Sequence, residues 1–248
     1  MRKIHAVTRS RWHAFLLCLA VAAPAAASTF NISPIRVQLS AAHRMGVLTL
    51  TNAEDQPVVI QVRLVAWSQQ NGEEQLDETR ELLVTPPVLQ IPANSEQVVR
   101  VALRRDPDAT RELSYRVIFE EVPQAAPDNA IGLRVALRLS VPIFVAPAHG
   151  DSSADLSWEA HWLTEGKLEV AASNHGTGHL QVSGFDVQME GVKDPLRAIT
   201  AKYILPGSRM TWTLTPDAST DAVRQGSLSI HGHSDQGEFS AQVANNGS

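Results

Sequence analysis

Apolar and polar residues alternate along an unusually long stretch of the chain, from Ile131 to Val145. Every odd position is apolar, whereas the even positions carry Gly, Arg, Ala, Ser, Pro and Phe. A period of two predicts a β-strand with one buried face. Typical strands have about five or six residues, so part of this strand is expected to need a partner beyond its own sheet. The other interpretation is that all eight odd positions face the core of the same domain.

Shorter runs of the same kind fill the rest of the chain between turn residues, and Asn71-Gly72 is a hairpin signal. Further strands are expected at 30–39, 46–51, 58–67, 82–85, 88–91, 97–103, 115–122, 156–163, 167–172, 179–188, 202–205, 209–214, 226–232 and 238–243. The segment 69–81 is polar, and only 198–204 and 216–223 are compatible with a helical turn. The pattern predicts an all-β protein.

A small and polar stretch with linker chemistry, Pro147–Ser153, divides these strands into two groups. Short strands separated by Gly, Pro and Asn turns are typical of β-sandwiches. We therefore predict two immunoglobulin-like sandwich domains, at 28–147 and 148–248.

The first 27 residues read as a secretory signal peptide. A basic start precedes the apolar run Ala14–Ala23, and Ala25-Ala26-Ala27 is a small-residue cleavage site. That run is shorter than the ~20 residues that span a bilayer. Cys18 is the only cysteine and lies in this leader, so packing must stabilise the mature chain without disulfides. We expect a periplasmic protein with no membrane insertion.

The charge balance argues against nucleic acid as a partner. Four of the 21 Lys and Arg residues lie in the leader, which leaves 17 against 26 Asp and Glu, a balance of −9. An acidic surface repels phosphate backbones and anionic lipids.

Candidate catalytic groups do not converge, so no enzyme, cofactor or metal is expected. No G-x-S-x-G motif and no Gly-rich phosphate loop occurs. Glu120 and Glu121 are neighbours on a strand and point to opposite faces. His231, His233 and Asp235 alternate and could face one way, but alternation alone is weak evidence for a metal site. The tryptophans are expected to pack in the core or between domains.

Three ordered blocks resemble the PapD-like periplasmic pilus chaperones. They are TPPVLQIPANSEQVVRVAL (85–103), RELSYRVIFEEVP (111–123) and the end of the long strand, Phe144–Pro147. The second half is similar more faintly, through YILPGSRMTWTL (203–214) and SIHGHSDQGEF (229–239).

The resemblance implies an L-shaped molecule of two immunoglobulin-like domains with no catalysis and no cofactor. Such chaperones lend a strand to pilus subunits (pilins) that lack their own last strand, and deliver them to an outer-membrane usher. The alternative from a different class is a structural or adhesive surface immunoglobulin-like module. A self-capping dimer of the free chain is left open.

The resemblance also implies roles for individual residues. Arg36, in SPIRV, would grip the terminal carboxylate of the subunit in the interdomain cleft. Relatives carry a lysine as second carboxylate ligand where this chain has Pro142, a departure that resembles the archaic branch serving spore-coat-protein-U-like pilins. The donated side chains would be Ile131, Leu133, Val135, Leu137 and Leu139.

A further set implied by the resemblance is Arg100, Glu112 and Asp235. In the family these positions pair across the two domains, so here they would form an interdomain salt bridge that fixes the angle between the domains. The other interpretation of each is a solvated surface charge, worth ~0–1 kcal/mol.

Overall fold

The computed structural model describes residues 30–123, 136–216 and 227–244. The described residues form strands, turns and loops without a helix, which confirms the all-β prediction. Consequently no helix in this part of the chain could cross a membrane. The expected leader, 1–27, lies outside the described residues.

Residues 30–123 and 136–145 form the first sandwich. One sheet has the order β1-β3-β8-β6, and the other has the order β2-β10-β9-β4-β5 with β7 also paired to β4. The strands are β1 (Phe30–Ser33), β2 (Val37–Leu39), β3 (Met45–Asn52), β4 (Val58–Gln70), β5 (Glu73–Glu78), β6 (Leu82–Thr85), β7 (Val88–Ile91), β8 (Ser95–Leu103), β9 (Leu113–Glu121) and β10 (Arg138–Val145).

Residues 156–216 and 227–244 form the second sandwich, from sheets of order β11-β12-β15 and β14-β13-β16-β17. Its strands are β11 (Leu156–Trp162), β12 (Leu168–Asn174), β13 (Leu180–Met189), β14 (Leu196–Ile204), β15 (Arg209–Leu214), β16 (Ser227–Ser234) and β17 (Gly237–Ala244).

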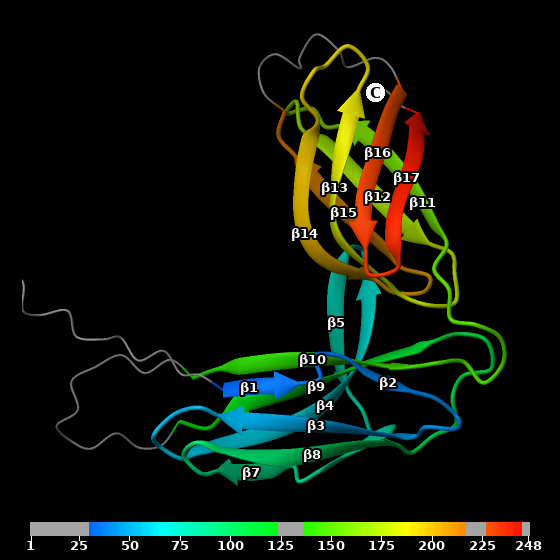
Figure 1. The fold of residues 1–248 in the computed structure, drawn as a ribbon. Coiled ribbons are helices and arrows are strands. Elements are labelled where there is room, and N and C mark those ends of the chain that lie inside the picture. The colour runs from blue at the N-terminus through cyan, green and yellow to red at the C-terminus, as the bar shows by residue number, and fades with distance from the viewer. Residues whose placement is uncertain (1–29, 124–135, 217–226, 245–248) are drawn as a thin grey trace, which may run out of the picture.

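Each sandwich has its own apolar core. Alternate side chains of facing sheets fill the first, as with Leu48 and Leu50 on β3 and Val99 and Val101 on β8, all fully buried. A second core lies within residues 160–243, and Trp162 and Trp212 belong to it. The two sandwiches are arranged in an L (Figure 1), as expected.

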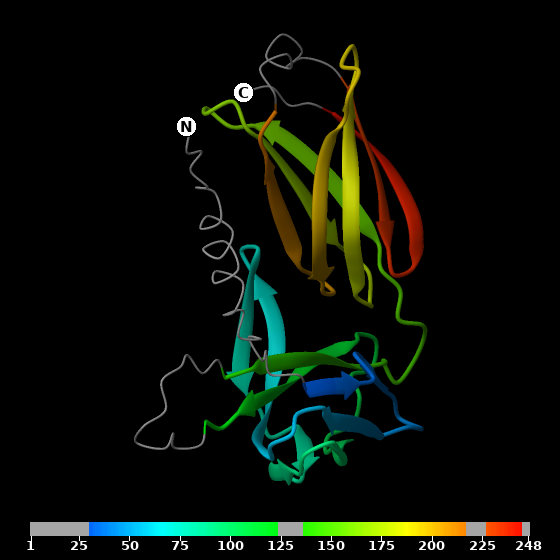
Figure 2. The same ribbon diagram turned by 60° about the vertical axis from the view of Figure 1, so that its left-hand side comes forward.

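Two segments of the structure differ from the sequence expectation. The 198–204 segment forms most of strand β14 instead of a helical turn, because it pairs antiparallel with β13. The polar segment 69–81 contains the hairpin that Asn71-Gly72 predicts, with positive φ at both residues. What was not expected is that Glu73–Glu78 forms a regular strand, β5, which pairs with the end of β4. The β4–β5 hairpin projects from the first sandwich toward the second (Figure 2), where Gly72 lies against Thr211 of β15.

A buried tyrosine is expected to make the first sandwich sensitive to acid. The Tyr115 hydroxyl on β9 donates to Glu81 Oε2 at 2.6 Å. This hydrogen bond, followed by that from Arg105, lowers the pKa of Glu81, while burial and then Glu81 raise the pKa of Tyr115. A carboxyl with a lowered folded-state pKa stabilises above its unfolded pKa of ~4.3, and that contribution is lost as the pH falls through the folded value.

Tyr115→Phe should therefore lower the free energy of unfolding by about 1–1.5 kcal/mol at pH 7, because a hydrogen bond to a charged group is lost and Glu81 is partly solvated. The loss should shrink by pH 3. Urea unfolding at both pH values measures it, with Glu81→Gln and the double variant completing a cycle. An equal loss at pH 3 and pH 7 would contradict the role assigned to Glu81.

Candidate functional site

Strand β10 is paired fully on one side and only at its end on the other. Its residues Arg138–Val145 lie antiparallel to β9, whereas only Ile143–Val145 pair with β2, in parallel. Among the described residues, Arg138–Pro142 therefore have no strand along their second edge. Such an edge offers backbone N–H and C=O groups to another strand.

The inner face of β10 becomes less buried from its last residue toward its first, where the second edge of the strand is open. Ile143 and Val145 are fully buried and Val141 nearly so, whereas Leu139 and Leu137 are partly buried against the same core. These odd positions share one side, as the alternation predicts for this part of the strand. Ile131, Leu133 and Val135, the other members of the expected donor set, lie outside the described residues.

Pro142 stands where the pairing of β10 changes. The strand has β9 alone beside it up to Pro142, and β2 joins at Ile143. Proline has no N–H to donate, so it fits an edge position directly before the new pairing. No cationic side chain can come from this position.

Arg36 lies in the bend before β2 and reaches across to the second sandwich. Its guanidinium donates to Asp235 Oδ2 at 2.7 Å, to the Tyr203 hydroxyl at 2.9 Å and to Gln181 Oε1 at 3.0 Å. It also lies 5.3 Å from the Tyr203 ring centroid. Burial alone would lower the pKa of Arg36, but the hydrogen bonds to Asp235 and Tyr203 raise it above its ordinary value. The cation is therefore held in the angle between the sandwiches.

Glu112 lies buried at the same junction. Its carboxylate accepts hydrogen bonds from the Ser152 hydroxyl at 2.7 Å and from the His179 backbone N–H at 3.2 Å, and His179 Nδ1 lies 2.6 Å from Oε1. Arg36, Glu112 and Asp235 are thus brought together from distant parts of the sequence.

Arg100 lies elsewhere. Its neighbours Val99 and Val101 face the first core, so the alternation of β8 turns Arg100 outward, where it is exposed. Within the part of the chain that the structure describes, Arg100 has no ion pair with Glu112 or Asp235. The cation that pairs with Asp235 across the junction is Arg36 instead.

Trp67, Phe144 and Leu205 form an apolar seam between the two sandwiches, beside these charged side chains. Phe144 is fully buried although it points away from the first core, because it packs with Trp67 of β4 and Leu205 of the second sandwich. Gln69 adds two hydrogen bonds to the same segment, to the Tyr203 carbonyl and from the Leu205 N–H. Burial of an aromatic seam and paired backbone groups fixes the angle at which the site is presented.

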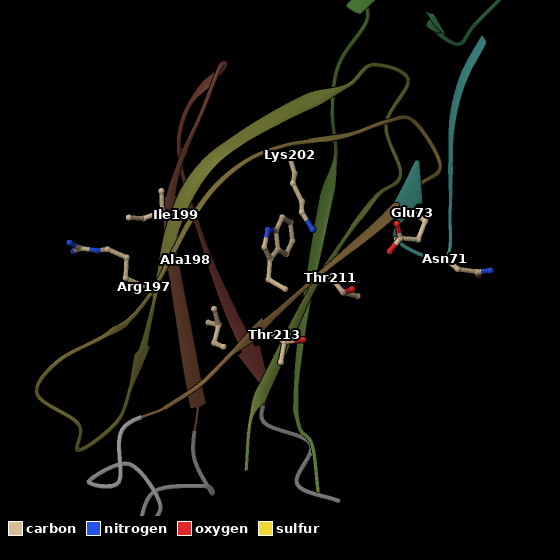
Figure 3. Close-up of a pocket in the computed structure, with 11 residues that line it drawn as sticks. Asn71, Glu73, Arg197, Ala198, Ile199, Lys202, Thr211 and Thr213 are labelled. Carbon is tan, nitrogen blue, oxygen red and sulfur yellow. The ribbon is translucent and has the colours of Figure 1, made fainter. Parts of the chain in front are cut away.

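The β4–β5 turn forms a second contact between the sandwiches. Asn71 and Glu73 lie at one end of a cleft of about 480 Å³, and Arg197 and Ile199 of β14 lie at the other (Figure 3). The expected site residues do not line it.

His179, Gln181, Tyr203 and Phe144 were not among the expected site residues. His179 and Gln181 come directly before and within β13, Tyr203 near the end of β14 and Phe144 near the end of β10. The one signal available in the sequence was Phe144, a large aromatic side chain on the otherwise small or polar side of the long alternation.

Comparison with known proteins gives a family and a fold. Residues 29–151 match the model described as pili and flagellar-assembly chaperone, PapD N-terminal domain. No curated protein matches the sequence.

Solved structures match over most of the chain. One is the CsuC-CsuE chaperone–tip subunit pre-assembly complex from archaic chaperone-usher Csu pili of Acinetobacter baumannii, with a TM-score of 0.66 and 19% identity, covering 88% of this chain and 99% of that one. The Pseudomonas aeruginosa CupB2 chaperone matches with a TM-score of 0.55 and 18% identity, covering 87% and 100%. The Salmonella enterica SafA pilin complex with the SafB chaperone gives 0.56 and 18%, covering 87% and 96%.

Proposed function

The chain belongs to the PapD-like family of pilus-assembly chaperones, and from this premise we propose that it is a periplasmic chaperone that binds a pilus subunit by donor-strand complementation and delivers it to an outer-membrane usher. The observation that carries the proposal is strand β10. The first part of this strand pairs with β9 on one edge only, and its inner face is only partly buried there. A subunit that lacks a strand exposes a groove and unpaired backbone, both of which such an edge can satisfy.

The strength of this interaction suits a temporary complex. Each fully buried Leu or Val contributes roughly 1.5–3 kcal/mol. Four or five anchors from Ile131, Leu133, Val135, Leu137 and Leu139 would contribute a gross ~6–15 kcal/mol by the same figure. Association costs of ~4–15 kcal/mol offset much of it. The subunit can therefore be held and still be passed to a better-fitting strand.

The absence of a lysine at Pro142 supports a place in the archaic branch, whose partners would be spore-coat-protein-U-like pilins. We place the carboxylate of the subunit at Arg36, because that guanidinium offers a planar set of donors at the inner angle of the L.

Delivery requires a second surface, free while the subunit occupies β10. Met45 and Val47 on β3, Leu83 on β6 and Val98 on β8 are exposed on the outer face of the four-stranded sheet, around Arg100. We refer to these residues as the outer apolar patch. The patch lies on the sheet opposite β10 (Figure 1), so an usher could contact it without competing with the subunit.

Periplasmic co-expression with a spore-coat-protein-U-like pilin and an usher N-terminal domain tests both contacts. The chain should form a stoichiometric complex with the pilin that then captures the usher domain. Val47→Glu with Leu83→Glu should keep the pilin and weaken usher capture at least tenfold, because charges enter an apolar contact.

Val88→Glu with Leu76→Glu is the matched control, since both positions are exposed and apolar but lie outside the patch. Failure to bind any such pilin, or recovery of the chain as a component of a surface fibre, would contradict the proposal.

A further inference from the structure

The carboxylate of Asp235 at the junction faces two basic side chains, Arg36 and His179. Asp235 is anchored through Oδ1, which accepts the Gln181 backbone N–H at 2.8 Å. Its other oxygen, Oδ2, lies 2.7 Å from Arg36 Nη1 and 3.9 Å from His179 Nε2. Oδ2 therefore bonds to Arg36 in this structure, while a hydrogen bond to His179 lies one small side-chain rotation away.

The His179 ring is fixed so that Nε2 faces Asp235. Its Nδ1–H donates to Glu112 Oε1 at 2.6 Å, and the ring stacks on Phe144 with centroids 3.5 Å apart and an interplanar angle of 7°. The His179 and Glu112 side chains are only 7% and 4% exposed. The imidazole cannot turn away without losing both contacts.

Side chains from four different segments of the chain contact or face the His179 ring. Glu112 comes from the loop before β9, Asp235 from the β16–β17 turn and Tyr203 from β14, while Phe144 of β10 is uncharged. Arg36 lies beyond Asp235. With neutral His179 the two carboxylates and Arg36 leave a net charge of −1, and with protonated His179 the group is neutral.

A subunit carboxylate bound at Arg36 would add another negative charge to this partly buried group. Low dielectric makes such an excess costly unless a positive charge is added nearby. Imidazole is the side chain that ordinarily gains a proton between pH 5 and 8.

We propose that His179 is the second cation of the carboxylate anchor. When the subunit carboxylate occupies Arg36, Asp235 Oδ2 turns from Arg36 to His179, and Nε2 takes up one proton from solvent to donate to it. The histidine thereby supplies the positive charge that Pro142 cannot, from the second sandwich instead of from β10. This inference rests on the proposed function, and it makes subunit capture dependent on pH.

A competition experiment isolates this effect from titrations of the pilin itself. Wild type and His179→Gln, in equal excess, compete for a limiting amount of the co-expressed spore-coat-protein-U-like pilin at pH 6 and at pH 8. Wild type should be favoured at least fivefold at pH 6 and less than twofold at pH 8, because the proposed uptake of a proton is easier at the lower pH. His231→Gln, at an exposed position in the second sandwich, should compete equally with wild type at both pH values.

The outcomes separate the two proposals. If neither protein binds pilin at either pH, the proposed function fails. If both bind and the wild-type advantage is the same at pH 6 and pH 8, the role of His179 as titrating cation is overturned.

A second measurement does not depend on the variant folding. The His179 ring proton signals of the wild-type chain are titrated by NMR, free and in the pilin complex. A titration midpoint that rises on complex formation supports the proton uptake, and an unchanged midpoint overturns it.

Discussion

Replacement of Leu137 and Leu139 together by glutamate is expected to abolish subunit binding while the chain stays folded. Leu139 lies on the inner face of β10 where the strand has one neighbour, and Leu137 directly precedes β10. Both pack against the first core and are only partly buried. In the complex they would enter the groove of the subunit. A glutamate there would have to be buried without a partner or would hold the two surfaces apart.

The expected loss exceeds a hundredfold in affinity, because two anchors of roughly 1.5–3 kcal/mol each are removed and each tenfold change corresponds to about 1.4 kcal/mol. Competition against wild type for limiting pilin measures the loss. Leu76→Glu is the control, because it places the same charge at an exposed leucine on β5, the far edge of the same sheet.

Circular dichroism and urea unfolding show whether the double variant retains the first sandwich. If the folded double variant competes within threefold of wild type, Leu137 and Leu139 do not contact the subunit and the role proposed for β10 is contradicted.

The β10 result shows how far alternation can predict a role. The odd positions from Leu137 to Val145 do share the inner face, because a pleated strand leaves no other choice. Alternation says nothing about what covers the other face. Phe144 is fully buried there because His179 and Leu205 of the second sandwich pack on it.

Errors in the strand assignment have the same origin. The residues of β5 are exposed throughout, so no apolar period marks them, and the strand exists because it pairs with β4 and Arg116 binds Glu74 at 2.7 Å. In β14, Ala198 is buried beside a 90% exposed Ile199, and pairing with β13 outweighs the mixed local pattern.

The charged residues at the junction show what the sequence cannot predict about a site between two domains. Resemblance pointed to Arg36, Glu112 and Asp235, and all three lie at the junction. It gave no sign that His179 stands between the two carboxylates or that Asp235 pairs with Arg36. Arg100 carries the positive charge that a partner of Glu112 or Asp235 would need, but the alternation of β8 directs it outward. Contacts made by two separately folded sandwiches depend on the angle between them, which no local pattern encodes.

Arg36→Ala is expected to give the second largest loss of subunit binding. The guanidinium presents several donors at the inner angle of the L, and its three side-chain partners hold it in that orientation. Truncation of one member of a desolvated, hydrogen-bonded charge pair costs 2–5 kcal/mol, which corresponds to roughly 30- to 4,000-fold in affinity. Arg36→Lys should recover only part of this, because an ammonium lacks the planar fork that a carboxylate fits.

Arg36 also pairs with Asp235, so its loss could act by changing the angle between the sandwiches instead of by removing the anchor. Small-angle X-ray scattering of the free variant separates the two, because the apolar seam of Trp67, Phe144 and Leu205 should keep the radius of gyration unchanged. Arg100→Ala removes an exposed arginine of the same sandwich and should compete for pilin as wild type does. Arg36→Ala binding that equals wild type, in a chain of unchanged shape, would place the subunit carboxylate elsewhere, because no other change in that variant could restore the lost donors.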